Sequence, residues 1–63
     1  MRGFGERLVK LRGKRTQQEV ADALEISTSA VGMYEREERI PRDELKLRMA
    51  KYFNRSVQYI FFN

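Results

Sequence analysis

The sequence has no cysteine and no histidine among its 63 residues. Without cysteine, neither a disulfide framework nor a thiolate metal site can supplement the core. Without histidine, zinc binding and histidine-based acid/base catalysis are excluded too. No apolar run approaches the roughly 20 residues that a transmembrane helix needs, and the N-terminus lacks the apolar stretch of a secretory signal. We therefore expect a complete cytoplasmic protein without a cofactor, a metal or a small-molecule ligand.

Chain length and charge indicate how many domains the protein has and what kind of partner it binds. A folded chain of this length hides only roughly 60% of the surface that its unfolded form exposes, so one small domain of marginal stability is expected, at residues 1–63. The formal charge is +4. Residues 1–15 carry six cations and one anion, residues 16–38 one cation and six anions, and residues 39–63 six cations and two anions. A nucleic acid would therefore be held electrostatically from the two flanks.

Hydrophobic spacing predicts an all-α fold. Phe4, Leu8 and Leu11 follow one another at i, i+4 and i+7, and Leu45 and Met49 begin a similar stripe. No segment alternates in the manner of a strand. We expect helices at residues 3–13, 17–24, 28–36, 42–53 and 56–62.

Several residues indicate where these helices begin. Thr16 followed by Glu19 is a capping box, in which each side chain accepts a hydrogen bond from the other residue's backbone N–H. Either Ser27 or Thr28 can cap the third helix. Pro41 suits the first turn of the fourth helix.

The second and third helices form a pair joined by only three residues, 25–27. So tight a turn makes the helices cross steeply and leaves the second of the two prominent on the surface. Ala21 lets the helices approach closely, Ile26 would fill the corner, and Val31 would pack beneath it. This spacing favours a helix-turn-helix over an ordinary helical hairpin.

The run TQQEVADALEISTSAVGMYE, residues 16–35, resembles the phage-repressor/Cro-like (Xre) helix-turn-helix family of bacterial and phage transcriptional regulators. The flanks FGERLVKLR and RIPRDELKLRMAKYFNRSVQYIFF are similar too, so the resemblance extends from Phe4 to Phe62. It implies a compact five-helix DNA-binding domain that is not an enzyme. It also implies a homodimer on a palindromic operator in double-stranded DNA, with repression the commoner outcome.

The resemblance assigns roles to individual positions. The third helix would read bases in the major groove, and its outward residues are Thr28, Ser29, Gly32 and Met33. The residues expected at DNA phosphates, around the second helix and the loop after the third, are Gln17, Ser27, Arg36, Arg39 and Arg42. Arg12 would form a partly buried ion pair with Glu35 and so fix the reading helix to its scaffold.

Some positions depart from the family pattern. Glu25 stands where glycine is usual, at a position of positive φ, which costs about 1–2 kcal/mol. Arg36-Glu37 replaces a common Asn-Gly, which leaves the end of the third helix without its usual cap. Residues 28–35 contain no Arg or Lys, so they cannot read guanine by a bidentate contact. Sequence recognition by this helix would instead depend on hydroxyl groups, contacts with thymine methyl groups and DNA shape. We expect Glu37 and Glu38 to point away from DNA.

The C-terminal segment holds more apolar surface than one short helix can hide. Val57, Ile60 and Phe61 are expected to complete the core, and Tyr59 and Phe62 to form a two-fold contact. Two reading helices one DNA turn (~34 Å) apart can then read a palindrome.

Other functions are weighed against this interpretation. Catalysis is disfavoured because the serine and threonine hydroxyls have no histidine base. RNA recognition is disfavoured because an exposed aromatic platform is lacking. A protein-interaction module on the same fold, such as an antirepressor or an antitoxin-like partner, stays open because residues 16–38 are acidic.

Overall fold

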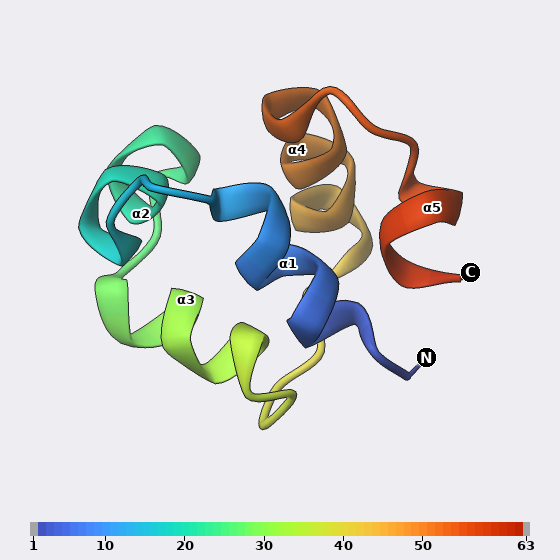
Figure 1. The fold of residues 1–63 in the computed structure, drawn as a ribbon, viewed down its shortest axis with the longest axis horizontal. Coiled ribbons are helices and arrows are strands. Elements are labelled where there is room, and N and C mark those ends of the chain that lie inside the picture. Colours follow the sequence, from blue (N-terminus) through green and yellow to red (C-terminus); the bar gives the residue numbers. More distant parts are fainter. Residues whose placement is uncertain (1, 63) are drawn as a thin grey trace.

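Five helices make up the computed structural model, which describes residues 2–62 (Figure 1). They are α1 (Phe4–Arg12), α2 (Gln17–Leu24), α3 (Thr28–Glu35), α4 (Asp43–Phe53) and α5 (Val57–Phe61). None of residues 2–62 lies in a strand, so the all-α prediction is confirmed. Four helices are slightly shorter than expected because the residues at their ends are caps: Gly3, Gly13, Arg36, Arg42, Ser56 and Phe62.

Side-chain caps begin three of the helices. The capping box of α2 is present: the Thr16 hydroxyl accepts from the Glu19 N–H at 3.0 Å, and the Thr16 N–H donates to Glu19 Oε1 at 3.1 Å. Ser27, rather than Thr28, caps α3. The placement of Pro41 in the first turn of α4 is wrong, because α4 begins at Asp43 and Pro41 lies before its cap.

Left-handed backbone occurs at the ends of three helices, in the caps Glu25 of α2 and Asn54 of α4 and in Glu37, which follows the cap of α3. Glu25, Glu37 and Asn54 have φ values of 60°, 59° and 57°. After α3, the N–H of Glu37 donates to the Tyr34 carbonyl and the N–H of Glu38 to the Met33 carbonyl, which is the Schellman arrangement. The helix is thus capped without the usual Asn-Gly, at the steric cost of a β-carbon at Glu37.

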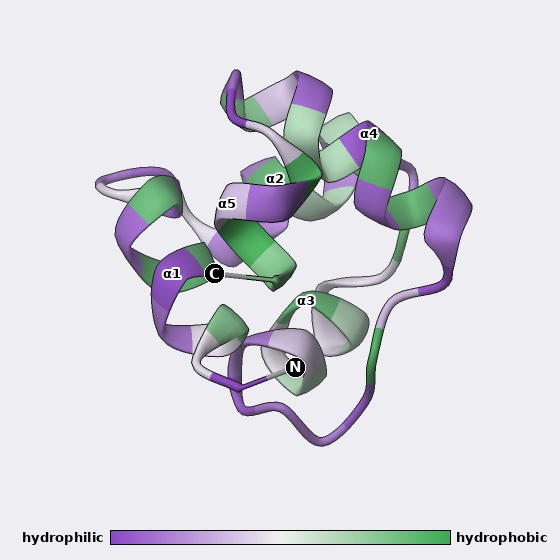
Figure 2. Ribbon diagram, turned by 90° about the vertical axis from the view of Figure 1, so that its right-hand side faces the viewer, coloured by the Kyte–Doolittle hydropathy of each residue, from purple (hydrophilic) through white to green (hydrophobic). Residues whose placement is uncertain are grey.

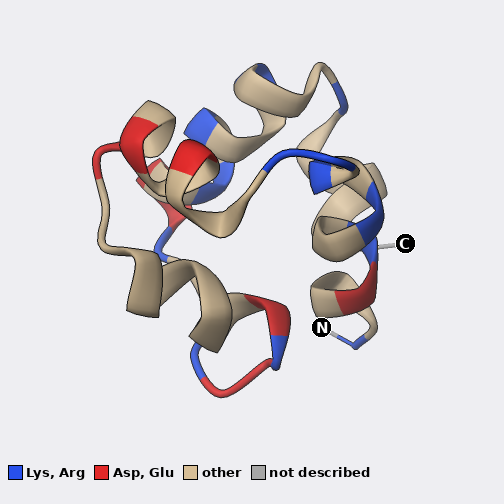
Figure 3. Cartoon of the chain, turned by 60° about the vertical axis from the view of Figure 1, so that its left-hand side comes forward, with Lys and Arg blue, Asp and Glu red and all other residues tan. Residues whose placement is uncertain are grey.

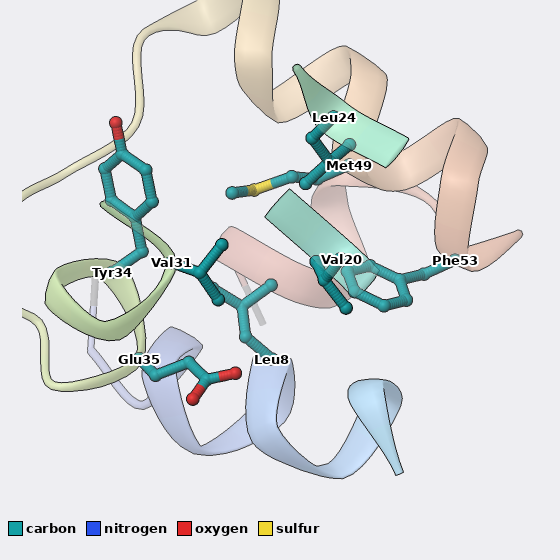
Figure 4. A pocket seen from close by; sticks show the side chains of 8 residues that line it. All are labelled: Leu8, Val20, Leu24, Val31, Tyr34, Glu35, Met49 and Phe53. Carbon is teal, nitrogen blue, oxygen red and sulfur yellow. The ribbon is translucent and has the colours of Figure 1, made fainter. Parts of the chain in front are cut away.

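The core lies where α1, α2, α3 and α4 converge. Figure 4 shows Leu8, Val20, Val31 and Met49 pointing toward one another from these four helices. The gap that they line is only about 10 Å³, at the lower limit for one water molecule. Figure 2 shows that hydrophilic and hydrophobic residues alternate in bands along the helices, as expected for helices with one buried side.

α5 closes the core from the side opposite α2. Ile60 and Phe61 are buried, and Val57 is partly buried against the core. Figure 1 shows that α5 lies across the molecule from α2. None of the helices within residues 2–62 is long and apolar enough to cross a membrane.

Candidate nucleic-acid interface

The helix pair α2–α3 buries one side of α3 and leaves the other accessible. Ala21 has no exposed surface, and Val31 and Tyr34 are buried against the rest of the core. The opposite side of α3, together with the first turn of α2 and the loop after α3, borders a shallow open hollow. Its lining residues are Gln17, Thr28, Ser29, Gly32, Met33, Arg36 and Glu38.

Of the expected base-reading residues, Ser29 is the most accessible. Its side chain is exposed, whereas Thr28 is half-buried and its hydroxyl donates to Gln18 Oε1 at 2.8 Å. Ser27, expected at a phosphate, is exposed, and its hydroxyl accepts from the Ala30 N–H at 3.0 Å. A serine hydroxyl can cap a helix and still donate its proton to a phosphate.

Gly32 and Met33 differ from the expectation that both face outward. Met33 is half-buried and lines the hollow. Gly32 is buried, because the guanidinium of Arg36 lies above it; a β-carbon there would meet Arg36 Nη1 at 2.9 Å. The expectation that Gly32 is exposed is therefore wrong, although Gly32 lines the hollow.

Arg36 and Glu38 form an ion pair beside this hollow. Arg36 Nε donates to Glu38 Oε2 at 3.0 Å, and Nη2 donates to Oε1 at 3.1 Å. These hydrogen bonds hold the pKa of the Glu38 carboxyl below its ordinary value and raise the pKa of Arg36. The expectation that Glu38 points away from the DNA-facing side is wrong, because Arg36 draws it to the hollow.

Glu35 connects α3 to two other helices. Its carboxylate accepts from Arg12 Nε at 2.7 Å, from Arg12 Nη2 at 3.2 Å and from Gln17 Nε2 at 2.8 Å. The hydrogen bonds with Glu35 raise the pKa of Arg12. Arg12 Nη1 also donates to the Arg15 carbonyl at 2.9 Å. The ion pair therefore fixes the C-terminal end of α3 to α1, and the Gln17 hydrogen bond fixes it to the start of α2.

A close backbone contact also holds α1 against the C-terminal end of α3. A β-carbon on Gly5 would lie 2.2 Å from the carbonyl oxygen of Glu35, so only glycine fits there without movement. The Gly5 N–H donates to Glu37 Oε2 at 3.2 Å, across 32 positions of sequence. Glu37 thus points toward the N-terminus of α1, where the positive end of the helix dipole favours a carboxylate.

The arginines after α3 do not gather at one place. Arg36 lines the hollow on the accessible side of α3. Arg39 and Arg42 line a different hollow, with Tyr34 in its wall, and the Arg39 guanidinium carbon lies 6.0 Å from the Tyr34 ring centroid. Because Tyr34 is on the buried side of α3, the two arginines flank the reading helix rather than share its accessible side.

Arg15, which lies just before α2, makes its contacts within the protein. Its guanidinium carbon lies 5.1 Å and 5.3 Å from the ring centroids of Tyr52 and Phe53 in α4. Its side chain also donates to the carbonyls of Leu11 and Arg12. Arg15 therefore caps the end of α1 and ties it to α4, which the one-dimensional charge pattern did not indicate.

The two residues expected at a dimer contact are both accessible. Tyr59 is 44% and Phe62 54% exposed. Phe62 lies in an apolar hollow with Leu47, which is 64% exposed. Tyr59 is not among the residues that line this hollow. The sequence reasoning missed Leu47, although its place outside the stripe of α4 that packs on the core already indicates an exposed apolar residue.

Charge is unevenly distributed around the helix pair. Figure 3 shows α3 uncharged until its last residue, followed by a loop in which basic and acidic residues alternate. The exposed acidic residues Glu19, Asp22 and Glu25 lie on α2 and directly after it.

A comparison with known proteins agrees with this architecture. A family model described as helix-turn-helix matches residues 7–60, which include both members of the helix pair and extend into α5. No curated protein and no solved structure matches the chain significantly. Proteins of this family are DNA-binding regulators and are not typically enzymes. Because the match spans most of the chain and the helix pair is present in the fold, the protein belongs to the Xre/Cro-like helix-turn-helix family of DNA-binding transcriptional regulators.

Proposed function

We propose that this protein is a sequence-specific, double-stranded DNA-binding repressor that acts as a homodimer. The supporting observation is the accessible side of α3, where Ser29 and Met33 line an open hollow while Val31 and Tyr34 are buried. A helix presented in this way fits the major groove of B-DNA.

Where the side chains lie supports a proposed role for each residue. Thr28, Ser29 and Met33 are proposed to contact base edges, with Met33 against thymine methyl groups. Phosphate contacts are proposed for Gln17 and Ser27, at the starts of α2 and α3, and for Arg39 and Arg42, which flank α3. Phosphate contacts supply most of the affinity and little of the sequence preference.

Dimerisation is proposed through α5 and the exposed side of α4. Phe62 and Leu47 border one apolar hollow, and Tyr59 adds exposed aromatic surface on the same short helix. Since α5 lies across the molecule from α2 (Figure 1), a contact there leaves the first turn of α2 free in both copies. A two-fold axis through this surface would match a palindromic operator.

Binding to random duplex DNA at several salt concentrations tests the function. The logarithm of the binding constant should fall linearly with the logarithm of salt concentration, because phosphate contacts release counterions. Selection from a random duplex pool should then return a palindrome. Met33→Ala should change the selected sequence, whereas Arg39→Ala should weaken binding to all sequences about equally. If Met33→Ala leaves both affinity and preference intact, the accessible side of α3 is not the reading face.

One observation favours a second candidate, a protein-interaction module such as an antirepressor or an antitoxin-like partner. Glu19, Asp22 and Glu25 are exposed acidic residues on α2 and directly after it, and α3 itself carries no cation. An acidic surface repels DNA and suits a basic protein partner. No measurable affinity for random duplex at low salt would favour this candidate over the repressor.

A further inference from the structure

We infer that Arg36 reads a guanine in each operator half-site, with Glu38 as the residue that positions its guanidinium. The inference rests on the proposed function and deepens it. It changes the expected role of Arg36 from a phosphate contact to a base contact, and it supplies the guanine-reading group that residues 28–35 lack.

The first step is the location of the guanidinium. Arg36 caps the C-terminus of α3, but its side chain extends back by one turn to lie above Gly32. The three heavy atoms nearest to a β-carbon at Gly32 all belong to this guanidinium. Arg36 therefore enters the same hollow as Ser29 and Met33. The absence of a side chain at Gly32 makes this position possible.

The second step is the orientation of the guanidinium. Glu38 accepts hydrogen bonds from Nε and Nη2, which together form one edge of the planar group. None of residues 2–62 accepts a hydrogen bond from Nη1. A guanidinium has five N–H donors in a fixed fork, so the edge formed by Nη1 and the second hydrogen of Nη2 remains available. Glu38 fixes the plane of the group through one edge and leaves another edge for a ligand.

The third step is the chemistry of the ligand. Guanine presents two acceptors, O6 and N7, side by side in the major groove, and two parallel N–H donors of arginine match them. A phosphate accepts from either edge and from lysine as well, so it does not need an oriented guanidinium. Carboxylate support from Glu38 lowers the number of rotamers that Arg36 must give up on binding. The arrangement therefore suits a base better than a phosphate.

The experiment compares operator preferences of the intact protein and single variants by selection from a random duplex pool, followed by affinity measurements on single-base substitutions. Arg36→Ala should lose the preference for guanine at one position of each half-site, with discrimination there falling by about 5- to 150-fold. Glu38→Gln, which removes the charge and keeps the shape, should relax discrimination at that same position. Arg39→Ala is the matched control, because it removes an exposed arginine from the same loop and should leave every preference unchanged.

Arg36→Lys separates charge from geometry, since it keeps the positive charge and loses the planar fork. It should retain affinity for random duplex and its dependence on salt, while losing guanine preference. Circular dichroism should show all variants folded, because Arg36 and Glu38 are both exposed.

Two results would overturn the inference while leaving the proposed function intact. In the first, Arg36→Ala weakens binding to all sequences equally, as a phosphate contact would. In the second, Glu38→Gln tightens binding to all sequences without changing any preference, which would mean that Glu38 only competes with DNA for Arg36. Absence of salt-sensitive binding to random duplex by the unaltered protein would overturn the proposed function and the inference together.

Discussion

Replacing Gly5 by alanine tests how closely α1 packs against α3. The new β-carbon would lie 2.2 Å from the carbonyl oxygen of Glu35 and 2.9 Å from Glu37 Cγ, whereas ordinary contact begins at 3.4 Å. The carbonyl belongs to the backbone and cannot rotate away. The two helices must therefore separate by about 1 Å, because a close-packed interior has no room to absorb the added atom.

The separation should lower stability. It stretches the hydrogen bond from the Gly5 N–H to Glu37 and the 2.7 Å contact between Arg12 and Glu35. Overpacking of this kind costs about 1–3 kcal/mol of unfolding free energy. In a domain of this size, each kcal/mol lowers the melting temperature by about 4–8 °C. Thermal and urea unfolding followed by circular dichroism would measure the loss.

Gly32→Ala is the matched control, since it is the same substitution in another helix. Its β-carbon would meet Arg36 Nη1 at 2.9 Å, and the end of a long exposed side chain can move aside. Alanine also favours the helix over glycine, by up to about 1 kcal/mol, so Gly32→Ala should be as stable as the parent or more so. If Gly5→Ala matched Gly32→Ala in stability, the close packing of α1 on α3 would be refuted.

Three further predictions concern the charged residues. Arg12→Ala should cost about 2 kcal/mol of unfolding free energy because it leaves the buried Glu35 carboxylate without its charged partner. Arg48→Ala, which removes the exposed ion pair between Arg48 and Glu44, should change the unfolding free energy by less than about 0.5 kcal/mol. Equal losses in chemical denaturation would contradict this. Arg15→Ala should lower the melting temperature without altering the salt dependence of DNA binding, because its contacts lie within the protein; a reduced salt slope would indicate a phosphate contact instead. The pKa of Glu38, measured by NMR titration, should lie below its ordinary value and return to that value in Arg36→Ala. Because folding lowers this pKa, the ion pair stabilises the folded protein at neutral pH, and the stabilisation is lost as the pH falls through the lowered pKa.

The sequence was sufficient to predict the helices because their signals are local. The capping box at Thr16 and Glu19 and the left-handed residue at Glu25 depend on neighbours within a few positions. Hydrophobic spacing then indicates which side of each helix is buried. The same reasoning distinguished Val31 from Ser29 on α3, and Val31 is buried whereas Ser29 is exposed.

The long charged side chains could not be predicted in this way. Glu37 contacts the backbone of Gly5, and Arg15 stacks on two aromatic rings of α4; each contact joins residues more than 30 positions apart in sequence. Lys46 is another case, since it is buried beside the Phe61 ring although lysine is rarely buried. Long side chains choose among many rotamers, and the choice depends on tertiary neighbours that a charge pattern does not contain.

Two Arg–Glu ion pairs with the same chemistry differ in exposure. The buried pair holds α3 in place, whereas the exposed pair lies where DNA is proposed to bind. The Arg12 and Glu35 side chains are 21% and 7% exposed, whereas those of Arg36 and Glu38 are 59% and 53% exposed. At ordinary ionic strength, salt largely screens exposed charges that are more than about 8–10 Å apart, and it screens buried pairs much less. Raising salt should therefore weaken phosphate contacts while α3 keeps its angle to α1. Because hydrogen bonds to bases depend on that angle more than on net charge, sequence preference should persist at salt concentrations where most non-specific affinity is lost.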